Sequence, residues 1–221
     1  MFLYCEVLKA GCSNWKRIIF VLKTNVNVKA DYLEHDHIHG SRWLKRLSDY
    51  PKEKQCLRLA NYTKVIFTRD PLQRIVSAYR DKFFHAAGYH GIQLPKIIKA
   101  KFRKNKTCLE NVSFDEFVHY ILENKPKTND VHWRPFYHLC DPCNINYDIL
   151  GKFETLKPDS DYVLKVIGAP PGLKYPEVKQ FNESRTDAKT SAGYYNQLPL
   201  DLLQSLLEIY SLDFYLFDYA Q

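Results

Sequence analysis

Hydrophobic positions at the start of the chain change from a continuous run to a helical repeat. Residues 2–7 are mostly apolar and predict a short buried strand. Trp15, Ile18, Ile19 and Leu22 then recur at the spacing of one helix face. The pattern predicts a turn around Gly11 that joins a strand to a helix, with Ser13 or Asn14 as a suitable N-cap.

A strand-to-helix turn of this kind favours anion binding. The first backbone N–H groups of the helix point at one place, and the positive end of the helix dipole lies there. Gly11 allows a left-handed turn or a close backbone approach, and Lys9 and Lys16 add positive charge. The spacing differs from the Walker A motif, which disfavours an ordinary ATPase or GTPase.

A second strand, turn and helix follow at residues 65–79. Val65, Ile66 and Phe67 predict the strand, Asp70 a helix cap, and Pro71 the first helical turn. Arg69 is then at the carboxyl end of a strand, and Ser77 is two turns into the helix. Because parallel α/β sheets bind ligands beyond the carboxyl ends of their strands, both turns are expected to face one crevice. Two such turns indicate a ligand with two phosphate ends.

The remaining pattern predicts further helices and one more strand. Residues 24–64 are interpreted as a connection with helical pieces, including a short helix near Trp43, Leu44 and Leu47, and the basic, aromatic segment 83–106 as an exposed insert. Ser113 with Glu116 has capping-box spacing. A strand is expected at 147–155, a helix from Ser160, a loop at 173–197 and a final helix at 198–210. The fold class is therefore α/β, a parallel sheet flanked by helices.

Composition narrows the choice of partners. The chain has 221 residues, which suits a single domain, and no apolar stretch approaches the roughly 18 residues of a membrane span. Its formal net charge of +7 suits a polyanion, either nucleic acid or an acidic glycan. Four Asn-x-Ser/Thr sequons favour the secretory pathway and therefore the glycan; they begin at Asn61, Asn105, Asn111 and Asn182.

The two motifs resemble those of a known family, the Golgi carbohydrate sulfotransferases related to chondroitin 4-O-sulfotransferase and the HNK-1 sulfotransferase. The first reads Leu8-Lys9-Ala10-Gly11-Cys12-Ser13-Asn14-Trp15-Lys16-Arg17 and is similar to the family's 5′-phosphosulfate loop. The second reads Arg69-Asp70-Pro71-Leu72-Gln73-Arg74-Ile75-Val76-Ser77-Ala78-Tyr79 and is similar to its 3′-phosphate segment. Leu8, Ser13 and Asp70 depart from the family's usual proline, threonine and glutamate. Similar blocks at 130–135, 139–143, 147–156 and 209–219 extend the resemblance over essentially the whole chain.

This resemblance implies a P-loop-like sulfotransferase fold in which residues 1–221 form one catalytic domain. Family members also carry a cytoplasmic tail, a membrane anchor and a stem, and we expect these to be absent from this chain. The implied reaction transfers a sulfuryl group from 3′-phosphoadenosine 5′-phosphosulfate to a sugar hydroxyl, without a metal, in the Golgi lumen. The acceptor is expected to be a glycosaminoglycan, such as chondroitin or dermatan at the 4-hydroxyl of GalNAc, or a glycoprotein glycan.

The resemblance also assigns the site residues. Lys9 is expected to stabilise the departing phosphate, and the donor is expected to contact Lys9, Ala10, Gly11, Cys12, Ser13, Asn14 and Trp15 together with Arg69, Asp70, Pro71, Leu72, Gln73, Arg74, Ile75, Val76 and Ser77. His132 is the candidate base, because histidine titrates near the working pH and Asp130 or Arg134 could orient it. The alternative for His132 is a packing role, and Glu154 is the second candidate base.

Other features admit alternative interpretations. His35, His37 and His39 alternate in a polar segment and are interpreted as solvated rather than as metal ligands. Cys140-x-x-Cys143 lacks a second ligand pair for zinc, so a disulfide is expected there. Cys12 is expected to pack rather than react. Two other functions stay open: a non-catalytic glycan-binding module of this family, and a nucleic-acid-binding protein that uses the segment 83–106.

Overall fold

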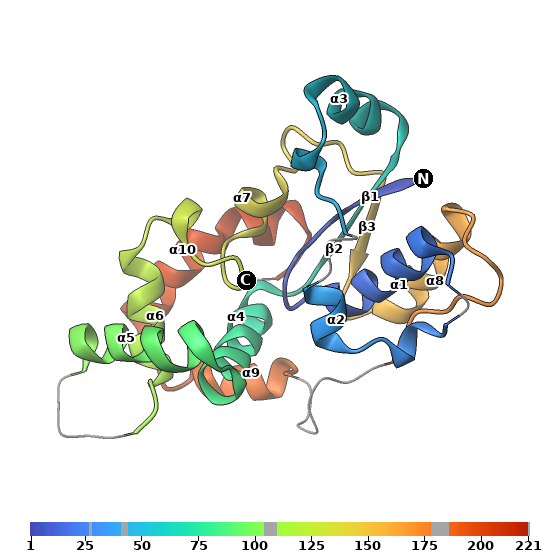
Figure 1. Cartoon of the computed structure of the whole chain (residues 1–221). Coiled ribbons are helices and arrows are strands. Elements are labelled where there is room, and N and C mark those ends of the chain that lie inside the picture. The colour runs from blue at the N-terminus through green and yellow to red at the C-terminus, as the bar shows by residue number, and fades with distance from the viewer. Residues whose placement is uncertain (27, 41–43, 104–109, 178–185, 221) are drawn as a thin grey trace. The chain divides into compact units, whose positions relative to one another are not determined.

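The computed structural model describes residues 1–26, 28–40, 44–103, 110–177 and 186–220 (Figure 1). The chain forms two compact units. The sheet unit comprises Met1–Arg69 and Cys140–Glu183, and the helical unit comprises Asp70–Leu139 and Ser184–Gln221. The chain therefore passes from the first unit to the second between Arg69 and Asp70. The organisation as one domain stays a prediction.

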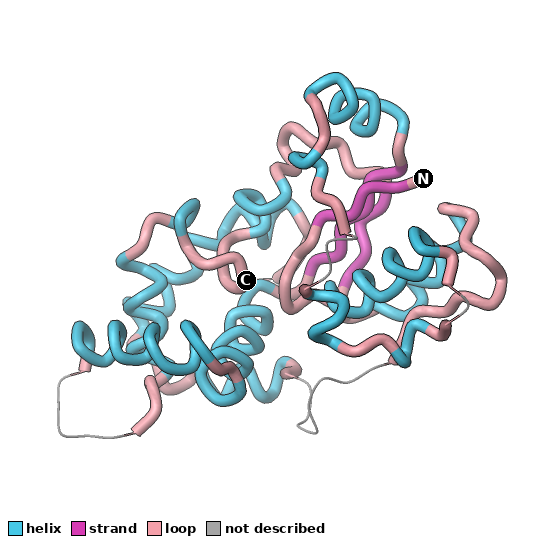
Figure 2. Tube along the Cα trace, viewed as in Figure 1, coloured by secondary structure: helices cyan, strands magenta, loops and turns pink. Residues whose placement is uncertain are grey.

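Three parallel strands form the centre of the sheet unit, shown in magenta in Figure 2. They are β1 (Phe2–Cys5), β2 (Thr63–Thr68) and β3 (Ile149–Lys152), in the order β1-β2-β3. Tyr4 pairs with Val65, and Ile66 pairs with Leu150. Such parallel strands need crossover connections, which here carry helices. The predicted class, a parallel sheet flanked by helices, is confirmed.

Helices α1 (Cys12–Thr24) and α8 (Leu156–Val166) lie beside the sheet in Figure 1. Alternate residues of the central strand, Val65 and Phe67, point toward them and share a buried core with Trp15 and Val163. Burial of such side chains is the main stabilising contribution, about 1.5–3 kcal/mol for each large apolar side chain. Helix α8 begins four residues before the predicted start at Ser160, because Leu156 faces this core.

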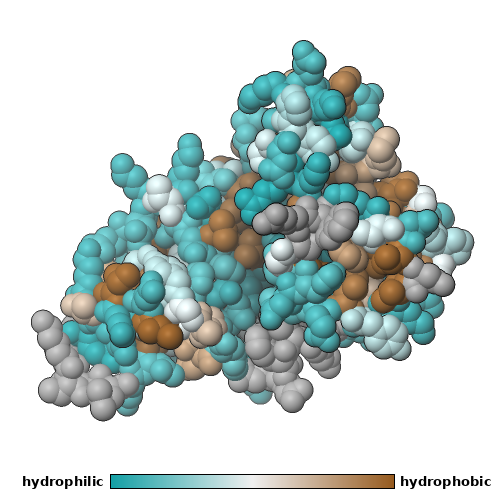
Figure 3. Space-filling view, viewed as in Figure 1, coloured by the Kyte–Doolittle hydropathy of each residue, from teal (hydrophilic) through white to brown (hydrophobic). Residues whose placement is uncertain are grey.

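The connection between the first two strands contains helical pieces, as predicted. They are η1 (Ala30–Tyr32), α2 (His35–His39), η2 (Leu47–Asp49) and α3 (Lys52–Asn61). None of the residues of α3 is buried, and hydrophilic side chains cover this part of the face seen in Figure 3. Of the short helix expected near residue 43, Trp43 lies outside the described residues, and η2 begins at Leu47.

In the described part of the helical unit, five longer helices pack around one hydrophobic core. They are α4 (Pro71–Arg80), α5 (Leu94–Phe102), α6 (Phe114–Glu123), α9 (Ala188–Tyr195) and α10 (Leu200–Leu216). Shorter elements are η3 (Asp81–His85), η4 (Tyr89–Gln93), η5 (Pro126–Thr128) and α7 (Phe136–Cys140). Ser113 caps α6, and its capping box with Glu116 is confirmed.

Two expectations are wrong in part. The segment 83–106 is not an exposed insert throughout, because Phe83, Leu94 and Ile98 are buried in the core of the helical unit, and its residues 104–106 lie outside the described residues. Its outer face does expose Ile92 and Ile97, and hydrophobic side chains gather over α5 in Figure 3. The expected loop at 173–197 contains α9, whose cap is Asp187 accepting from the Thr190 amide. Its two buried residues, Ser191 and Tyr195, give too weak a pattern to reveal the helix.

The disulfide joins Cys5 to Cys140, and the predicted pair Cys140–Cys143 is wrong. The two bonded residues lie 135 positions apart in sequence, with their Cα atoms 5.9 Å apart. Cys140 is buried, whereas Cys143 is exposed and has a free thiol, as does the exposed Cys56. Cys108 lies outside the described residues.

Within the described part of the chain, no helix combines the length and the apolar character that crossing a bilayer requires.

Candidate functional site

The turn between β1 and α1 has a left-handed backbone at two residues. Lys9 has φ +69° and Gly11 has φ +85°. Gly11 is the N-cap of α1, so the predicted cap at Ser13 or Asn14 is wrong: the chain turns into the helix two or three residues earlier. Because Gly11 has no side chain, no side-chain cap covers the first amides of the helix, which are the groups that bind anions in such turns.

Tyr175 closes tightly over this turn. Its hydroxyl donates to the Gly11 carbonyl at 3.2 Å, and a Cβ atom on Gly11 would lie 2.7 Å from that hydroxyl. Tyr175 is buried, and its ring lies 5.9 Å from that of Trp15. Both the backbone angle and the lack of space therefore require glycine at position 11.

Three of the predicted donor-binding side chains face the protein interior. Ala10 and Trp15 are completely buried, and Cys12 is nearly so. The Trp15 ring packs 5.7 Å from Tyr4 and 5.2 Å from Phe67. Burial raises the pKa of the Cys12 thiol, with a smaller contribution from Glu6, which supports a packing role. At these three positions a ligand in the turn would meet backbone rather than side chain.

Ser13 contacts His39, an exposed residue that the sequence predicts to be solvated. Its Oγ lies 3.0 Å from His39 Nε2, while Lys16 Nζ lies 3.2 Å from His39 Nδ1. Since an ammonium group only donates, Nδ1 accepts and Nε2 carries the proton toward Ser13. The Ser13 oxygen thus accepts from His39, and its own proton stays available to donate to an anion. Lys16 also pairs with Glu6 at 2.5 Å.

Asn14 holds the start of α1 in place. Its side chain donates to the Pro176 carbonyl at 2.8 Å and accepts from Arg17 Nη1 at 2.8 Å. The buried Arg17 donates in turn to the Leu33 carbonyl at 2.8 Å. The Asn14 side chain is thus occupied with the segments that surround the turn.

Arg69 joins the two predicted anion-binding segments. This residue is 3% exposed, its Nη1 donates to the Lys9 carbonyl at 3.1 Å, and its guanidinium lies 4.1 Å from the centre of the Phe153 ring. The contact follows from the sheet, because β1 and β2 are parallel neighbours whose carboxyl ends lie at the same edge. The two turns thus meet at one edge of the sheet, and their facing one crevice stays a prediction.

Helix α4 begins as the sequence predicts. Asp70 caps it by accepting from the Gln73 amide at 2.8 Å, and Pro71 occupies the first turn. Leu72, Ile75 and Val76 belong to the core of the helical unit or pack against it. Among the predicted phosphate-binding residues of α4, Gln73 and Ser77 remain partly exposed, and a ligand could contact their side chains.

Arg74 is completely buried and has a structural role. It donates to the carbonyls of Arg134 at 2.7 Å and Val131 at 3.0 Å, and its guanidinium lies 4.7 Å from the centre of the Phe136 ring. The same segment is held by α10, where the Tyr210 hydroxyl donates to the Trp133 carbonyl. These contacts fix the backbone on both sides of His132.

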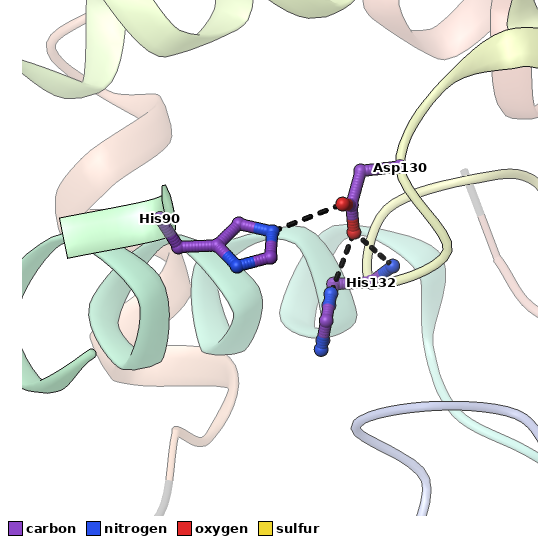
Figure 4. A group of neighbouring side chains, drawn as sticks. All are labelled: His90, Asp130 and His132. Carbon is purple, nitrogen blue, oxygen red and sulfur yellow. Dashed lines mark hydrogen bonds and ion pairs between the residues drawn. The ribbon is translucent and has the colours of Figure 1, made fainter. Parts of the chain in front are cut away.

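His132 forms a hydrogen-bonded group with Asp130 and His90 (Figure 4). Asp130 Oδ1 accepts from His132 Nδ1 at 2.6 Å and from the His132 amide at 2.9 Å. Asp130 Oδ2 lies 2.9 Å from His90 Nε2. The interpretation that Asp130 orients His132 is confirmed, whereas Arg134 donates from Nε to the Asn129 carbonyl at 2.8 Å. His90, which belongs to η4, carries no local sequence signal that would have revealed this contact.

The protonation states of this group follow from its contacts. Burial opposes ionisation of Asp130, but the hydrogen bonds from His132 and His90 outweigh it and hold the pKa of that carboxyl well below its usual range. Burial lowers the pKa of His132, although the hydrogen bond to Asp130 raises it in part. His132 is therefore neutral near pH 7, with a proton on Nδ1 and a lone pair on Nε2. This is the state of a general base.

The ligand atoms of His90, Asp130 and His132 lie within 4.8 Å of one another, which is close enough to hold a metal ion. Hydrogen bonds within the group already engage His132 Nδ1, His90 Nε2 and both carboxylate oxygens of Asp130. Glu154, the second candidate base, is exposed and follows β3 in the sheet unit.

Comparison with known proteins identifies relatives along the whole chain. The family described as "Sulfotransferase family" matches residues 1–220. Carbohydrate sulfotransferase 9 of Homo sapiens is 43% identical over 99% of this chain and 51% of its own length. Carbohydrate sulfotransferase 8 of Homo sapiens is 39% identical, and carbohydrate sulfotransferase 14 of Danio rerio is 38% identical, each over 99% of this chain. They are covered over 53% and 59% of their own lengths.

The chain thus spans about half the length of these relatives. No solved structure matches it.

Proposed function

The chain belongs to the sulfotransferase family, and from this premise we propose that it transfers a sulfuryl group from 3′-phosphoadenosine 5′-phosphosulfate to a carbohydrate hydroxyl. The observation that carries the proposal is the turn of the sheet unit. Lys9 and Gly11 turn left-handed before α1, and Arg69 donates to the Lys9 carbonyl at 3.1 Å. The two segments proposed for the two ends of the donor therefore begin side by side.

The turn supplies the contacts for the 5′-phosphosulfate. Amides at the start of α1 and the Ser13 hydroxyl donate to its oxygens, and the dipole of α1 favours their negative charge. Lys9 neutralises charge on the bridging oxygen as the bond between sulfur and that oxygen breaks. Preorganised electrostatic stabilisation of this kind is worth about 10²–10³ in rate for a single donor.

The 3′-phosphate contacts Arg69 and Ser77 in this proposal. A guanidinium forms charge-assisted hydrogen bonds with phosphate, and the serine hydroxyl adds a neutral donor. Arg74 belongs to the same sequence motif, but its guanidinium is committed to the carbonyls of Val131 and Arg134. We therefore assign Arg74 the support of the His132 segment rather than a phosphate contact.

His132 is the proposed general base. Its Nε2 takes the proton of the acceptor hydroxyl while the hydroxyl oxygen attacks sulfur, and 3′-phosphoadenosine 5′-phosphate leaves with the bridging oxygen. Atoms and charge balance, because one S–O bond forms as another breaks and the proton moves to the imidazole. A positioned base contributes typically about 10²–10⁴ in rate. The proposed chemistry uses no metal ion.

The acceptor is proposed to be an acidic glycan or a glycoprotein glycan, including the 4-hydroxyl of GalNAc in chondroitin or dermatan. The net charge of +7 supports a polyanionic partner, and the relatives described above are carbohydrate sulfotransferases by name. The protein is proposed to act in the Golgi lumen. The Cys5–Cys140 disulfide suits an oxidising compartment.

Labelled donor and a panel of desulfated glycosaminoglycans test this function. The wild-type protein is expected to transfer label to at least one glycan, and Lys9→Ala is expected to lower kcat about 10²–10³-fold. Lys23→Ala, at the other end of α1, is the matched control and should retain activity. Glycan binding without donor consumption, unchanged in Lys9→Ala, would instead identify a non-catalytic binding module. Binding to nucleic acid with a steep salt dependence would favour the third interpretation.

A further inference from the structure

Asp130 is shared between two imidazoles, only one of which the proposed reaction uses. One carboxylate oxygen accepts from His132 Nδ1 at 2.6 Å and the other accepts from His90 Nε2 at 2.9 Å, as Figure 4 shows. An ionised carboxylate has no proton to donate, so both histidine nitrogens that face it carry hydrogen. The two donors approach opposite oxygens and fix the plane of the carboxylate.

The surroundings hold His90 in this position. Its ring packs edge-on against His132 at 5.2 Å and against Trp133 at 6.2 Å, and its side chain is 21% exposed. Trp133 is completely buried, so the ring has a rigid neighbour. His90 comes from η4, forty residues before Asp130 in sequence. Its contact is thus a product of the tertiary fold.

We propose that His90 is a positioning residue: its hydrogen bond to Asp130 Oδ2 takes up part of the negative charge of that carboxylate, and thereby keeps His132 Nε2 deprotonated and available as the proton acceptor. The inference rests on the proposed role of His132 as the base. His90 makes no contact with the reacting atoms in this scheme. It acts by sharing the negative charge of Asp130, which would otherwise stabilise protonated His132 more strongly.

Other titratable groups also act on His132 and Asp130. Lys82 from η3 lowers the pKa of His132, and it pairs with Asp81 at 3.1 Å. Tyr89 from η4 and Tyr120 from α6 interact with each other, and Tyr120 interacts with Asp130. None of these groups is changed in the variants below, so a shift can be attributed to position 90.

The test compares His90→Leu, which has no donor, with His90→Gln, whose amide nitrogen can reach the place of Nε2. His119→Leu is the matched control, since His119 is about half exposed on α6 and lies 3.8 Å from Asp115. We measure kcat, KM for the donor, and the pKa of His132 by NMR titration of its ring proton. The NMR readout needs no sulfuryl transfer, so it separates this inference from the proposed function.

In His90→Leu we expect the acid limb of the kcat profile to move to higher pH, so that kcat measured on that limb falls about tenfold, with KM for the donor unchanged. The pKa of His132 is expected to rise in parallel, because Asp130 loses a competing donor and holds the imidazolium more tightly. His90→Gln should keep most of the activity and the wild-type titration. His119→Leu should change neither.

Each other outcome has a defined meaning. An unchanged His132 titration and an unchanged kcat in His90→Leu would overturn the inference. A shifted titration with unchanged kcat would leave His90 as a positioning residue and remove His132 as the base. If His90→Leu fails to fold, a wild-type titration with tenfold lower kcat in His90→Gln would also overturn the inference. Repeating the series in EDTA adds one more criterion: an effect of His90→Leu that disappears without metal ions would make His90 a ligand instead.

Discussion

The sheet unit and the helical unit build their candidate sites by different means. In the sheet unit, the turn at Lys9 and Gly11 is formed by neighbouring residues and presents backbone amides. In the helical unit, side chains about 40 to 60 residues earlier in the sequence position His132. His90 holds Asp130, the carboxylate partner of His132, and Arg74 holds the backbone on both sides of His132. A backbone site depends on local conformation, whereas a side-chain site depends on the packing of distant elements.

The largest effect on kcat should come from removing His132, the proposed base in the helical unit. In His132→Asn we expect kcat to fall about 10²–10⁴-fold with donor affinity retained, because the variant lacks the base but leaves the turn of the sheet unit intact. Steady-state kinetics and donor titration measure the two quantities. His138→Asn, six residues on, is the control. Equal losses of kcat and donor affinity would contradict the division of roles.

The pH dependence of kcat in the wild-type protein also tests the role of His132 as the base. A base is active when neutral, so kcat should be lost as the pH falls through the pKa of His132. Burial lowers that pKa, which places the acid limb of the profile below the ordinary histidine value of about 6.5.

The turn of the sheet unit should respond to backbone strain. Gly11→Ala combines a left-handed residue with a Cβ atom 2.7 Å from the Tyr175 hydroxyl, and we expect donor affinity to fall about tenfold or more. The strain alone costs roughly 1–2 kcal/mol. Isothermal titration with 3′-phosphoadenosine 5′-phosphate measures the affinity.

Two further variants separate the effect of backbone strain at position 11 from that of the steric contact with Tyr175. Gly168 has a similar φ of +67° but open space around it, so Gly168→Ala should lose stability without losing donor affinity. Tyr175→Phe should restore part of the affinity in the Gly11→Ala background, because it removes the nearest atom. If Gly168→Ala weakened the donor as much as Gly11→Ala, the turn would not be the binding element.

The smallest effect is expected at His39, where a side chain assists the backbone turn. His39→Ala removes the donor to Ser13 and the acceptor for Lys16, and we expect KM for the donor to rise about three- to tenfold with kcat nearly unchanged. His37→Ala is the control, because His37 packs against Phe20 instead. A fall in kcat with constant KM would contradict a role in the donor loop.

The sequence predicted best those features that short-range patterns determine. The strand, turn and helix around Gly11 and the cap of α4 by Asp70 follow from residues within a few positions of one another. The partnership of Asp130 with His132 was also accessible, because only two positions separate them. The predicted N-cap of α1 is nevertheless wrong, since a left-handed glycine such as Gly11 can start a helix without a polar side chain.

The remaining features depend on contacts that no local pattern encodes. His90 meets Asp130 across 40 residues, and His39 meets Ser13 across 26. Arg74 reads as a phosphate ligand from its motif, yet in the structure its guanidinium is buried against two carbonyls. Six cysteines allow 15 pairings, and only the fold brings Cys5 to Cys140.

That disulfide also sets an order of events during biosynthesis. Cys5 leaves the ribosome 135 residues before its partner, which at 5–20 residues per second is a delay of roughly 7–27 seconds. During this interval Cys12, Cys56 and Cys108 emerge and can compete for the Cys5 thiol. The covalent closure of the first strand must therefore wait until the segment 70–139 has been synthesised. An isomerase that corrects early pairings would be expected to raise the yield of the native protein.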